Sequence, residues 1–107
     1  MTADEWLEDG QRLEALGTAA EVLHTPGHTP GSCCFYFKQE NILISGDTLF
    51  RESLGRTDFP GSSTRDIILS IRRLFELPDE TAVYPGHGDE TSIGYEKIHN
   101  PVALYRG

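Results

Sequence analysis

The sequence predicts an α/β fold in which one mixed sheet carries a covering helix. Three observations predict it: strand-like apolar runs recur along the chain, most of them end in turns rich in glycine and proline, and one amphipathic stretch of helical period precedes the last run. A chain of 107 residues is long enough for one domain and too short for two, so we assign residues 1–107 to a single unit.

Glycine and proline delimit the first predicted elements. Residues 11–21 mix polar and apolar side chains around the breaks Gly10 and Gly17, which is typical of a short hairpin. Residues 21–24 then predict a strand. Residues 25–32 contain two prolines and two glycines, which deny the backbone both a ladder and a helix, so we expect a loop there.

Three further runs predict buried strands. Residues 33–37 are rich in aromatic side chains, and a polar turn at 38–41 separates them from residues 42–45. The run at 42–45 is apolar without alternation, which indicates cover on both faces of the sheet. Residues 81–84 predict the last strand, with Tyr84 assigned to the core.

A long loop and a helix connect these strands. Residues 51–63 have no hydrophobic period, and long loops of this kind are often functional. A helix is predicted over 64–76, because Ser63 can cap its first turn and Pro78 ends it. Its apolar face consists of Ile67, Ile68, Ile71, Leu74 and Phe75. The tail at 89–107 is expected to be irregular or weakly helical.

The predicted elements leave the sheet incompletely covered. Strands that are apolar on both faces need two covering layers, and one amphipathic helix protects only one face. The other layer would come from a missing part of the polypeptide, a second copy of the chain, or a different subunit.

Composition excludes several functional classes. Nine Lys and Arg against 17 Asp and Glu give a net charge of −8, which argues against nucleic-acid binding. No apolar run approaches the roughly 18 residues needed to cross a bilayer, so no membrane partner is expected. The acidic N-terminus lacks the features of a signal peptide, and we therefore expect a cytoplasmic location.

The two cysteines, Cys33 and Cys34, are adjacent in a predicted strand. Their side chains then point to opposite faces, where a disulfide between them would be strained. Zinc-binding spacings such as C-x₂-C are absent. We interpret both residues as structural thiols.

His28, Asp47 and His87 each follow a predicted strand and are flanked by glycine or proline. If these strands end at one edge of the sheet, the three side chains converge there. Imidazoles and a carboxylate suit a divalent cation such as Zn²⁺. The alternative is that they are ordinary surface loop residues. His24 and His99 are interpreted as structural.

The surroundings of these residues resemble a known family. Residues 24–32 (HTPGHTPGS), 44–50 (ISGDTLF) and 84–88 (YPGHG) resemble three successive metal-site motifs of the metallo-β-lactamase superfamily, in the family's order. The resemblance extends from Trp6 to Pro101. It implies the C-terminal half of the family's αββα sandwich, so that residues 1–107 would be a partial domain.

The same resemblance implies roles for individual residues. His28 would bind the first metal and His87 the second, while Asp47 would bridge both as a catalytic residue. The implied cofactor is a divalent metal, zinc in the first instance with iron or manganese as alternatives, at two sites in the complete fold.

Two segments point to one branch of the family. Residues 55–61 (GRTDFPG) and 86–94 (GHGDETSIG) look like the glyoxalase II-like group, whose members hydrolyse thioesters of glutathione. The implied function is hydrolysis of small-molecule thioesters such as hydroxyacylglutathione through a metal-bridged hydroxide. Persulfide dioxygenases, which use mononuclear iron, share the Gly-Arg-Thr-Asp stretch and are the alternative. Arg56 would bind an anionic substrate group or pair with Asp58.

The sequence departs from the family in one respect: the H-x-H-x-D-H motif, which belongs to the N-terminal half, is absent. Each metal would then keep one histidine and the shared aspartate, short of four ligands. No G-x-S-x-G elbow is present either, so Ser32 and Ser45 are interpreted as supporting groups. Two hypotheses follow: a hydrolase whose N-terminal half is supplied elsewhere or was lost, or a non-catalytic half-domain that folds by pairing its exposed sheet with another chain.

Overall fold

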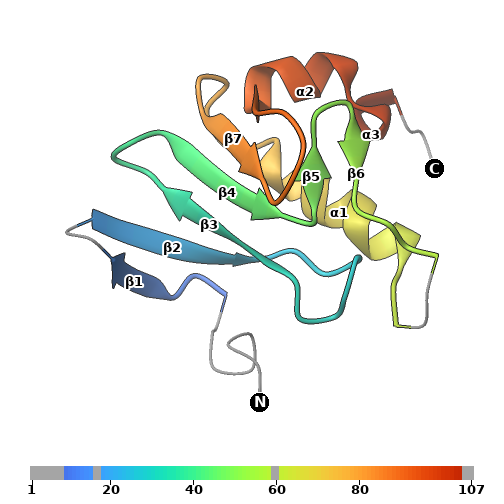
Figure 1. Cartoon of the computed structure of the whole chain (residues 1–107), viewed down its shortest axis with the longest axis horizontal. Coiled ribbons are helices and arrows are strands. Elements are labelled where there is room, and N and C mark those ends of the chain that lie inside the picture. Colours follow the sequence, from blue (N-terminus) through green and yellow to red (C-terminus); the bar gives the residue numbers. More distant parts are fainter. Residues whose placement is uncertain (1–8, 16–17, 59–60, 105–107) are drawn as a thin grey trace.

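The computed structural model describes residues 9–15, 18–58 and 61–104 (Figure 1). Its main sheet has six strands in the order β1-β2-β3-β4-β7-β8. These strands are β1 (Arg12–Ala15), β2 (Thr18–His24), β3 (Cys33–Phe37), β4 (Ile42–Gly46), β7 (Ala82–Pro85) and β8 (Thr91–Ser92). A separate hairpin consists of β5 (Leu49–Phe50) and β6 (Ser53–Leu54), and the helices are α1 (Thr64–Leu74), α2 (Ile93–His99) and α3 (Pro101–Leu104).

The main sheet is mixed, as predicted. Its neighbouring strands are antiparallel except for β4 and β7, which are parallel. Strands β2, β4 and β7 therefore run in the same direction, and their C-terminal ends lie at one edge of the sheet. The three loops that carry His28, Asp47 and His87 leave the sheet from this edge.

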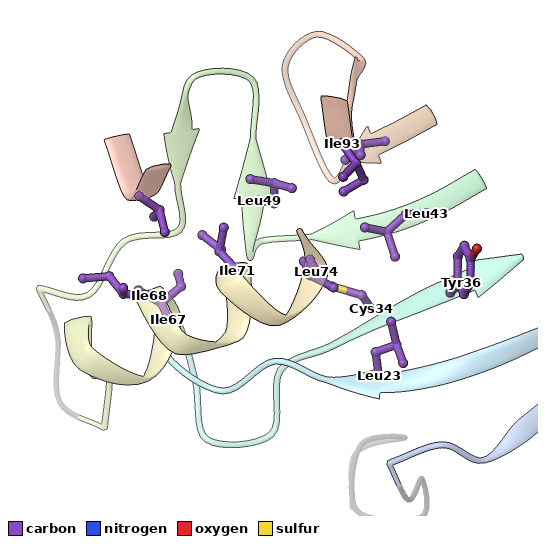
Figure 2. Close-up of a cluster of buried hydrophobic side chains, with 12 residues drawn as sticks. Leu23, Cys34, Tyr36, Leu43, Leu49, Ile67, Ile68, Ile71, Leu74 and Ile93 are labelled. Carbon is purple, nitrogen blue, oxygen red and sulfur yellow. The ribbon is translucent and has the colours of Figure 1, made fainter. Parts of the chain in front are cut away.

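One face of the sheet forms the core with the helices (Figure 2). Helix α1 presents Ile67, Ile71 and Leu74, none of which is exposed, to side chains of β3, β4 and β7. As predicted, Ser63 caps this helix, and its Oγ accepts a hydrogen bond from the Asp66 backbone N–H at 3.2 Å. The helix ends at Leu74, two residues before the predicted end.

The opposite face of the sheet is open among the described residues. Burial alternates along β3 and β4, so Phe35 is only half-buried and Ile44 is 41% exposed. The described residues therefore cover β4 on one face only, and the expected cover of its other face does not come from this part of the chain. Tyr84, which was expected in the core, is 42% exposed on the neighbouring strand β7. The predicted lack of a second covering layer is confirmed for the described residues.

Two segments have more regular structure than the sequence suggested. The expected loop at 51–63 begins with β6, which pairs with β5 across a two-residue turn. The tail after Asp89 contains β8, α2 and α3, and Ile93 and Val102 join the core from it. The hairpin expected at 11–21 is confirmed as β1 and β2, although its turn at 16–17 lies outside the described residues. Among the described residues, no helix is long and apolar enough to span a bilayer.

Candidate metal centre

The loop that carries His28 is held against the start of α1. The Gly27 backbone has φ +146°, and a Cβ at this position would overlap the main chain and side chain of Ile67. The backbone N–H of Ser63 donates to the Gly27 carbonyl at 2.7 Å, and the Ser70 hydroxyl donates to the Pro26 carbonyl at 2.8 Å. Helix α1 thus fixes the backbone on which His28 stands.

A buried group of hydroxyls joins the His28 loop to the Asp47 loop. The hydroxyls of Thr25 and Thr48 are hydrogen-bonded at 2.9 Å, and the Cys34 thiol lies 3.4 Å from Thr25 Oγ1. Both threonines and Cys34 are almost fully buried. Burial raises the pKa of Cys34 to about 11, although the hydrogen bonds from the two threonines oppose this rise. The thiol therefore stays neutral, as a structural group.

The His87 loop is tied to the same edge of the sheet. The Gly86 backbone N–H donates to the Gly46 carbonyl at 2.8 Å, which brings the residue before His87 next to the residue before Asp47. The ring of Phe50, at the end of β5, lies against the His87 ring with centroids 4.7 Å apart and planes tilted by 40°. The His87 side chain itself is largely exposed.

The structure brings His28, Asp47 and His87 together, with Asp47 between the two histidines. Asp47 Oδ2 lies 3.8 Å from His28 Nε2, and Asp47 Oδ1 lies 3.7 Å from His87 Nδ1. Each carboxylate oxygen therefore faces one imidazole. Two ligands of a tetrahedral zinc ion with bonds of 2.0–2.1 Å lie about 3.4 Å apart, which is close to these separations.

A hydrogen bond at Nδ1 of His28 determines whether the other ring nitrogen, Nε2, faces Asp47 with a proton or with a lone pair. His28 Nδ1 lies 2.9 Å from the Arg56 carbonyl oxygen, and a carbonyl can only accept, so Nδ1 carries the proton. In the neutral ring, Nε2 then offers a lone pair toward a carboxylate oxygen. Two acceptors that face each other repel unless a cation lies between them. The hydrogen bond from Nδ1 to the Arg56 carbonyl also fixes the orientation of the ring, as is usual for metal-binding histidines.

The three residues do not form a complete metal site. Within residues 9–15, 18–58 and 61–104, no group of three or more His, Cys, Asp or Glu side chains has the arrangement needed to hold an ion. The side chains instead form two pairs that share Asp47. An open cavity of about 590 Å³ lies beside them, lined by Phe50, Glu52 and other residues. The donor set fits divalent cations but supplies only part of each coordination shell.

Arg56 lies at this cavity and is paired with Asp58. Its Nε donates to Asp58 Oδ1 at 3.1 Å and its Nη2 donates to Asp58 Oδ2 at 2.9 Å. The guanidinium lowers the pKa of Asp58, and the carboxylate raises the pKa of Arg56. The ion pair considered from the sequence is therefore present. Arg56 also lines the cavity, and binding of a substrate by its guanidinium remains a proposal.

The sequence prediction missed the hairpin, which supplies Phe50, Arg51, Glu52, Ser53 and Leu54 to the cavity lining. The sequence signal for this hairpin was weak, because each of its strands has only two residues. The two residues between the strands also lack the glycine or asparagine that is typical of tight turns. The remaining histidines have other surroundings. The His99 ring packs on Tyr95 with centroids 4.3 Å apart, and the His24 backbone N–H donates to Asp9 at 2.9 Å.

The supporting role expected for the two serines agrees with their contacts. Ser32 Oγ accepts from the Thr29 backbone N–H at 3.0 Å, close to the His28 loop. The Ser45 hydroxyl donates to the Leu49 carbonyl at 2.7 Å, which fixes the turn that carries Asp47. Neither contact gives the serine an activated hydroxyl.

Comparison with known proteins identifies the family. The sequence pattern of the metallo-β-lactamase superfamily matches residues 2–87. The hydroxyacylglutathione hydrolase GloC of Haemophilus influenzae is 42% identical over 100 residues, which are 92% of this chain and 47% of that protein. The chain spans about half the length of the curated relatives it matches.

Solved structures agree on the fold. A protein crystallised in a di-iron-bound form is 46% identical with a TM-score of 0.82, and the match covers 89% of this chain and 46% of that one. ETHE1 from Myxococcus xanthus is 39% identical with a TM-score of 0.82, and the match covers 89% of this chain and 44% of ETHE1. The fold matches the expected C-terminal half of the family's sandwich, and the chain belongs to the metallo-β-lactamase superfamily.

Proposed function

We propose that this chain supplies half of the active site of a metal-dependent hydrolase that cleaves thioesters such as hydroxyacylglutathione. The observation that carries the proposal is the position of Asp47, whose two carboxylate oxygens each face a ring nitrogen of a different histidine. A carboxylate shared by two cations requires this arrangement. The name of the relative from Haemophilus influenzae supports the thioester class.

The side chains of the site suit divalent cations that accept nitrogen and oxygen ligands, such as zinc, iron and manganese. Bound cations supply Lewis-acid chemistry, in which they polarise a carbonyl and lower the pKa of water. His28 would hold the first cation in the orientation set by the Arg56 carbonyl, and His87 the second. Asp47 would keep the two cations at a fixed separation. We propose zinc, and the di-iron form of a relative supports testing iron as well.

Arg56 is the proposed substrate-binding residue. Asp58 engages its Nε and Nη2, which holds the guanidinium at the edge of the cavity and leaves Nη1 for another partner. A substrate such as a glutathione thioester carries carboxylates, and a guanidinium binds these with charge-assisted hydrogen bonds. Asp58 would therefore position Arg56 rather than neutralise it completely.

The open sheet face is the proposed docking surface for the rest of the domain. Ile44 and Tyr84 are each about two-fifths exposed there, and the relatives are about twice as long as this chain. A second β-layer with an apolar face would cover these side chains, and it would bring the remaining metal ligands to the edge where Asp47 lies. A complementary N-terminal half is the proposed occupant, and a second copy of this chain is the alternative.

Metal binding and turnover test the proposal together. The chain is purified alone and after mixing with an N-terminal half that contains H-x-H-x-D-H. Metal content is then measured by elemental analysis, and hydrolysis of lactoylglutathione by release of thiol. We expect two metal equivalents and turnover in the assembled protein. Asp47→Asn keeps the size of the side chain and should abolish both. Asp79→Asn, which removes an exposed partner of Lys97, is the matched control and should abolish neither.

The other outcomes decide between the alternatives. An assembled protein without metal or turnover would make the chain a non-catalytic half-domain and refute the proposal. Consumption of oxygen with a glutathione persulfide, with iron as the only active metal and no thiol release from thioesters, would identify a persulfide dioxygenase. Turnover by a homodimer of the chain alone would assign the second layer to another copy.

A further inference from the structure

Glu96, in α2, is a fully buried carboxylate that the proposed chemistry does not use. Its exposed fraction is 0%, which is rare for a glutamate. None of the ion pairs among residues 9–15, 18–58 and 61–104 includes Glu96. Its partners are neutral donors, which stabilise a charge that would otherwise be costly to bury.

Three hydrogen bonds reach the Glu96 carboxylate from three different segments. Oε1 accepts from the Glu52 backbone N–H at 2.9 Å and from Asn100 Nδ2 at 2.8 Å, while Oε2 accepts from the Thr91 hydroxyl at 2.6 Å. Glu52 lies in the turn between β5 and β6, 44 residues before Glu96 in the chain. The carboxylate therefore joins the hairpin to the C-terminal helices.

The hairpin turn needs such support from outside. Glu52 has φ +56°, in the left-handed region that residues with a side chain rarely adopt. Figure 1 shows α2 beside this turn. Two more contacts from the C-terminal segment hold the turn in place. The Tyr95 hydroxyl donates to Glu52 Oε2 at 2.8 Å, and Asn100 Nδ2 donates to the Ser53 carbonyl at 3.0 Å. Of these contacts, only the one from Glu96 binds the backbone of the strained residue.

The hairpin in turn contacts His87. Phe50 precedes the turn in β5, and its ring packs on the His87 ring with centroids 4.7 Å apart. The His87 side chain is otherwise largely exposed, so this ring contact is an important restraint on its orientation. A continuous path of contacts leads from Glu96 through the turn and Phe50 to His87.

We propose that Glu96 is a positioning residue of the site: its buried carboxylate sets the β5–β6 turn, and through Phe50 the turn orients the His87 ring. The value of this orientation for metal binding rests on the proposed function. The path of contacts itself does not, and it can be tested without metal.

Hydrogen exchange measured by NMR on the metal-free protein tests the path at both ends. Glu96→Ala removes the acceptor of the Glu52 N–H, so exchange of this amide should accelerate by about tenfold or more. The His87 ring resonances should shift in the same variant, because Phe50 changes its position over the ring. Ile98→Ala, at an exposed position of α2, is the control and should change neither signal.

Glu96→Gln separates the hydrogen bonds from the charge. Its carbonyl oxygen can still accept from Glu52 and Asn100, and its amide can donate to the Thr91 hydroxyl, which then accepts. We expect both signals to return to their wild-type values. If Glu96→Ala does not fold, Glu96→Asp replaces it, because its shorter side chain keeps the charge but withdraws from Glu52. The same acceleration is then expected.

The metal readout is kept separate. In the assembled protein, Glu96→Ala should weaken zinc affinity by roughly 10- to 100-fold, the range found when groups behind metal ligands are removed. A wild-type protein that binds no metal would refute the proposed function and leave the exchange result intact. Unchanged exchange at Glu52, or changed exchange without any shift of the His87 ring, would overturn the positioning role.

Discussion

Gly55 lies so close to Asp47 that a Cβ on Gly55 would overlap the Asp47 carbonyl oxygen. Its backbone N–H also donates to the Thr48 carbonyl at 3.0 Å, so Gly55 cannot move away without breaking this bond. Gly55→Ala should therefore displace the Asp47 backbone. We expect a loss of stability of about 2 kcal/mol, as for other overpacked positions, together with weaker metal binding. Chemical denaturation and a zinc titration measure the two effects.

Gly10→Ala is the control for this substitution. Gly10 has φ +81° but nothing lies within 4 Å of a Cβ placed there. The alanine should cost about 1 kcal/mol of backbone strain and leave metal binding unchanged, because Gly10 is not among the residues that line the cavity. Equal zinc affinity of the two variants would show that Gly55 does not determine the position of Asp47.

The Thr25 hydroxyl gives a second prediction about support beneath the site. Thr25→Val keeps the shape of the side chain but leaves the buried Thr48 hydroxyl without its 2.9 Å partner. The Thr48 hydroxyl then keeps only its contact with the Cys34 thiol, so loss of the buried Thr25–Thr48 hydrogen bond should destabilise the protein by about 1 kcal/mol. Urea unfolding followed by circular dichroism measures this loss.

Thr57→Val provides the matched comparison, since Thr57 makes a similar hydroxyl contact to Thr64 at 2.7 Å on the exposed surface. Water replaces the lost partner there, so we expect a change within about 0.5 kcal/mol. Should both valine variants unfold at the same urea concentration, the buried hydroxyl pair would have no special structural importance.

The regular parts of the fold could be predicted because their patterns are local. The strand at Cys33–Phe37 was predicted with its observed bounds, and the cap at Ser63 places the start of α1. The C-terminal helices α2 and α3 were expected only as an irregular or weakly helical tail, because they are short and their stability comes from tertiary contacts. Glu96 illustrates this, because its buried carboxylate in α2 depends on hydrogen bonds from Glu52 and Thr91, which only the tertiary fold brings next to it.

The site was only partly predictable for the same reason. His28, Asp47 and His87 stand in motifs with glycine and proline, so their position at strand ends could be inferred from the sequence. Tyr84 was assigned to the core because an apolar run does not reveal which face of a sheet lacks a partner. The contact between Phe50 and His87 joins residues 37 positions apart and leaves no local signal.

The two adjacent cysteines should react very differently. Burial raises the pKa of the Cys34 thiol to about 11, whereas Cys33 is only partly buried. Alkylation requires the thiolate, so iodoacetamide at pH 8 should modify Cys33 and spare Cys34 until the protein unfolds. Mass spectrometry of the peptide that contains both residues distinguishes the two sites. Cys33→Ser should abolish labelling of the folded protein, and rapid labelling of that variant would contradict the burial of Cys34.

Cys34 should also make stability depend on alkaline pH. Its folded pKa of about 11 lies above the ordinary value of 9.0, so the unfolded chain loses the thiol proton first. The stability linked to this group is therefore complete below about pH 9 and declines as the pH rises toward 11. Cys34→Ala removes this dependence. The difference in unfolding free energy between wild type and variant should shrink from pH 8 to pH 10, and a constant difference would contradict the raised pKa.

Ile44→Asp tests whether the open sheet face binds the complementary half. Ile44 is 41% exposed and lies in a central strand, so an aspartate there should cost the chain alone about 1 kcal/mol through its weak strand propensity. If a second β-layer covers this face, the same aspartate becomes a buried charge in the assembled protein. The assembly should then lose about 3 kcal/mol or more of binding free energy, measured by isothermal titration calorimetry. Ile98→Asp, at a position on α2 that is 68% exposed, introduces the same change away from the face and should bind normally. Equal affinity of the two variants would place the interface elsewhere, because no covering layer can accept a charge at Ile44 without cost.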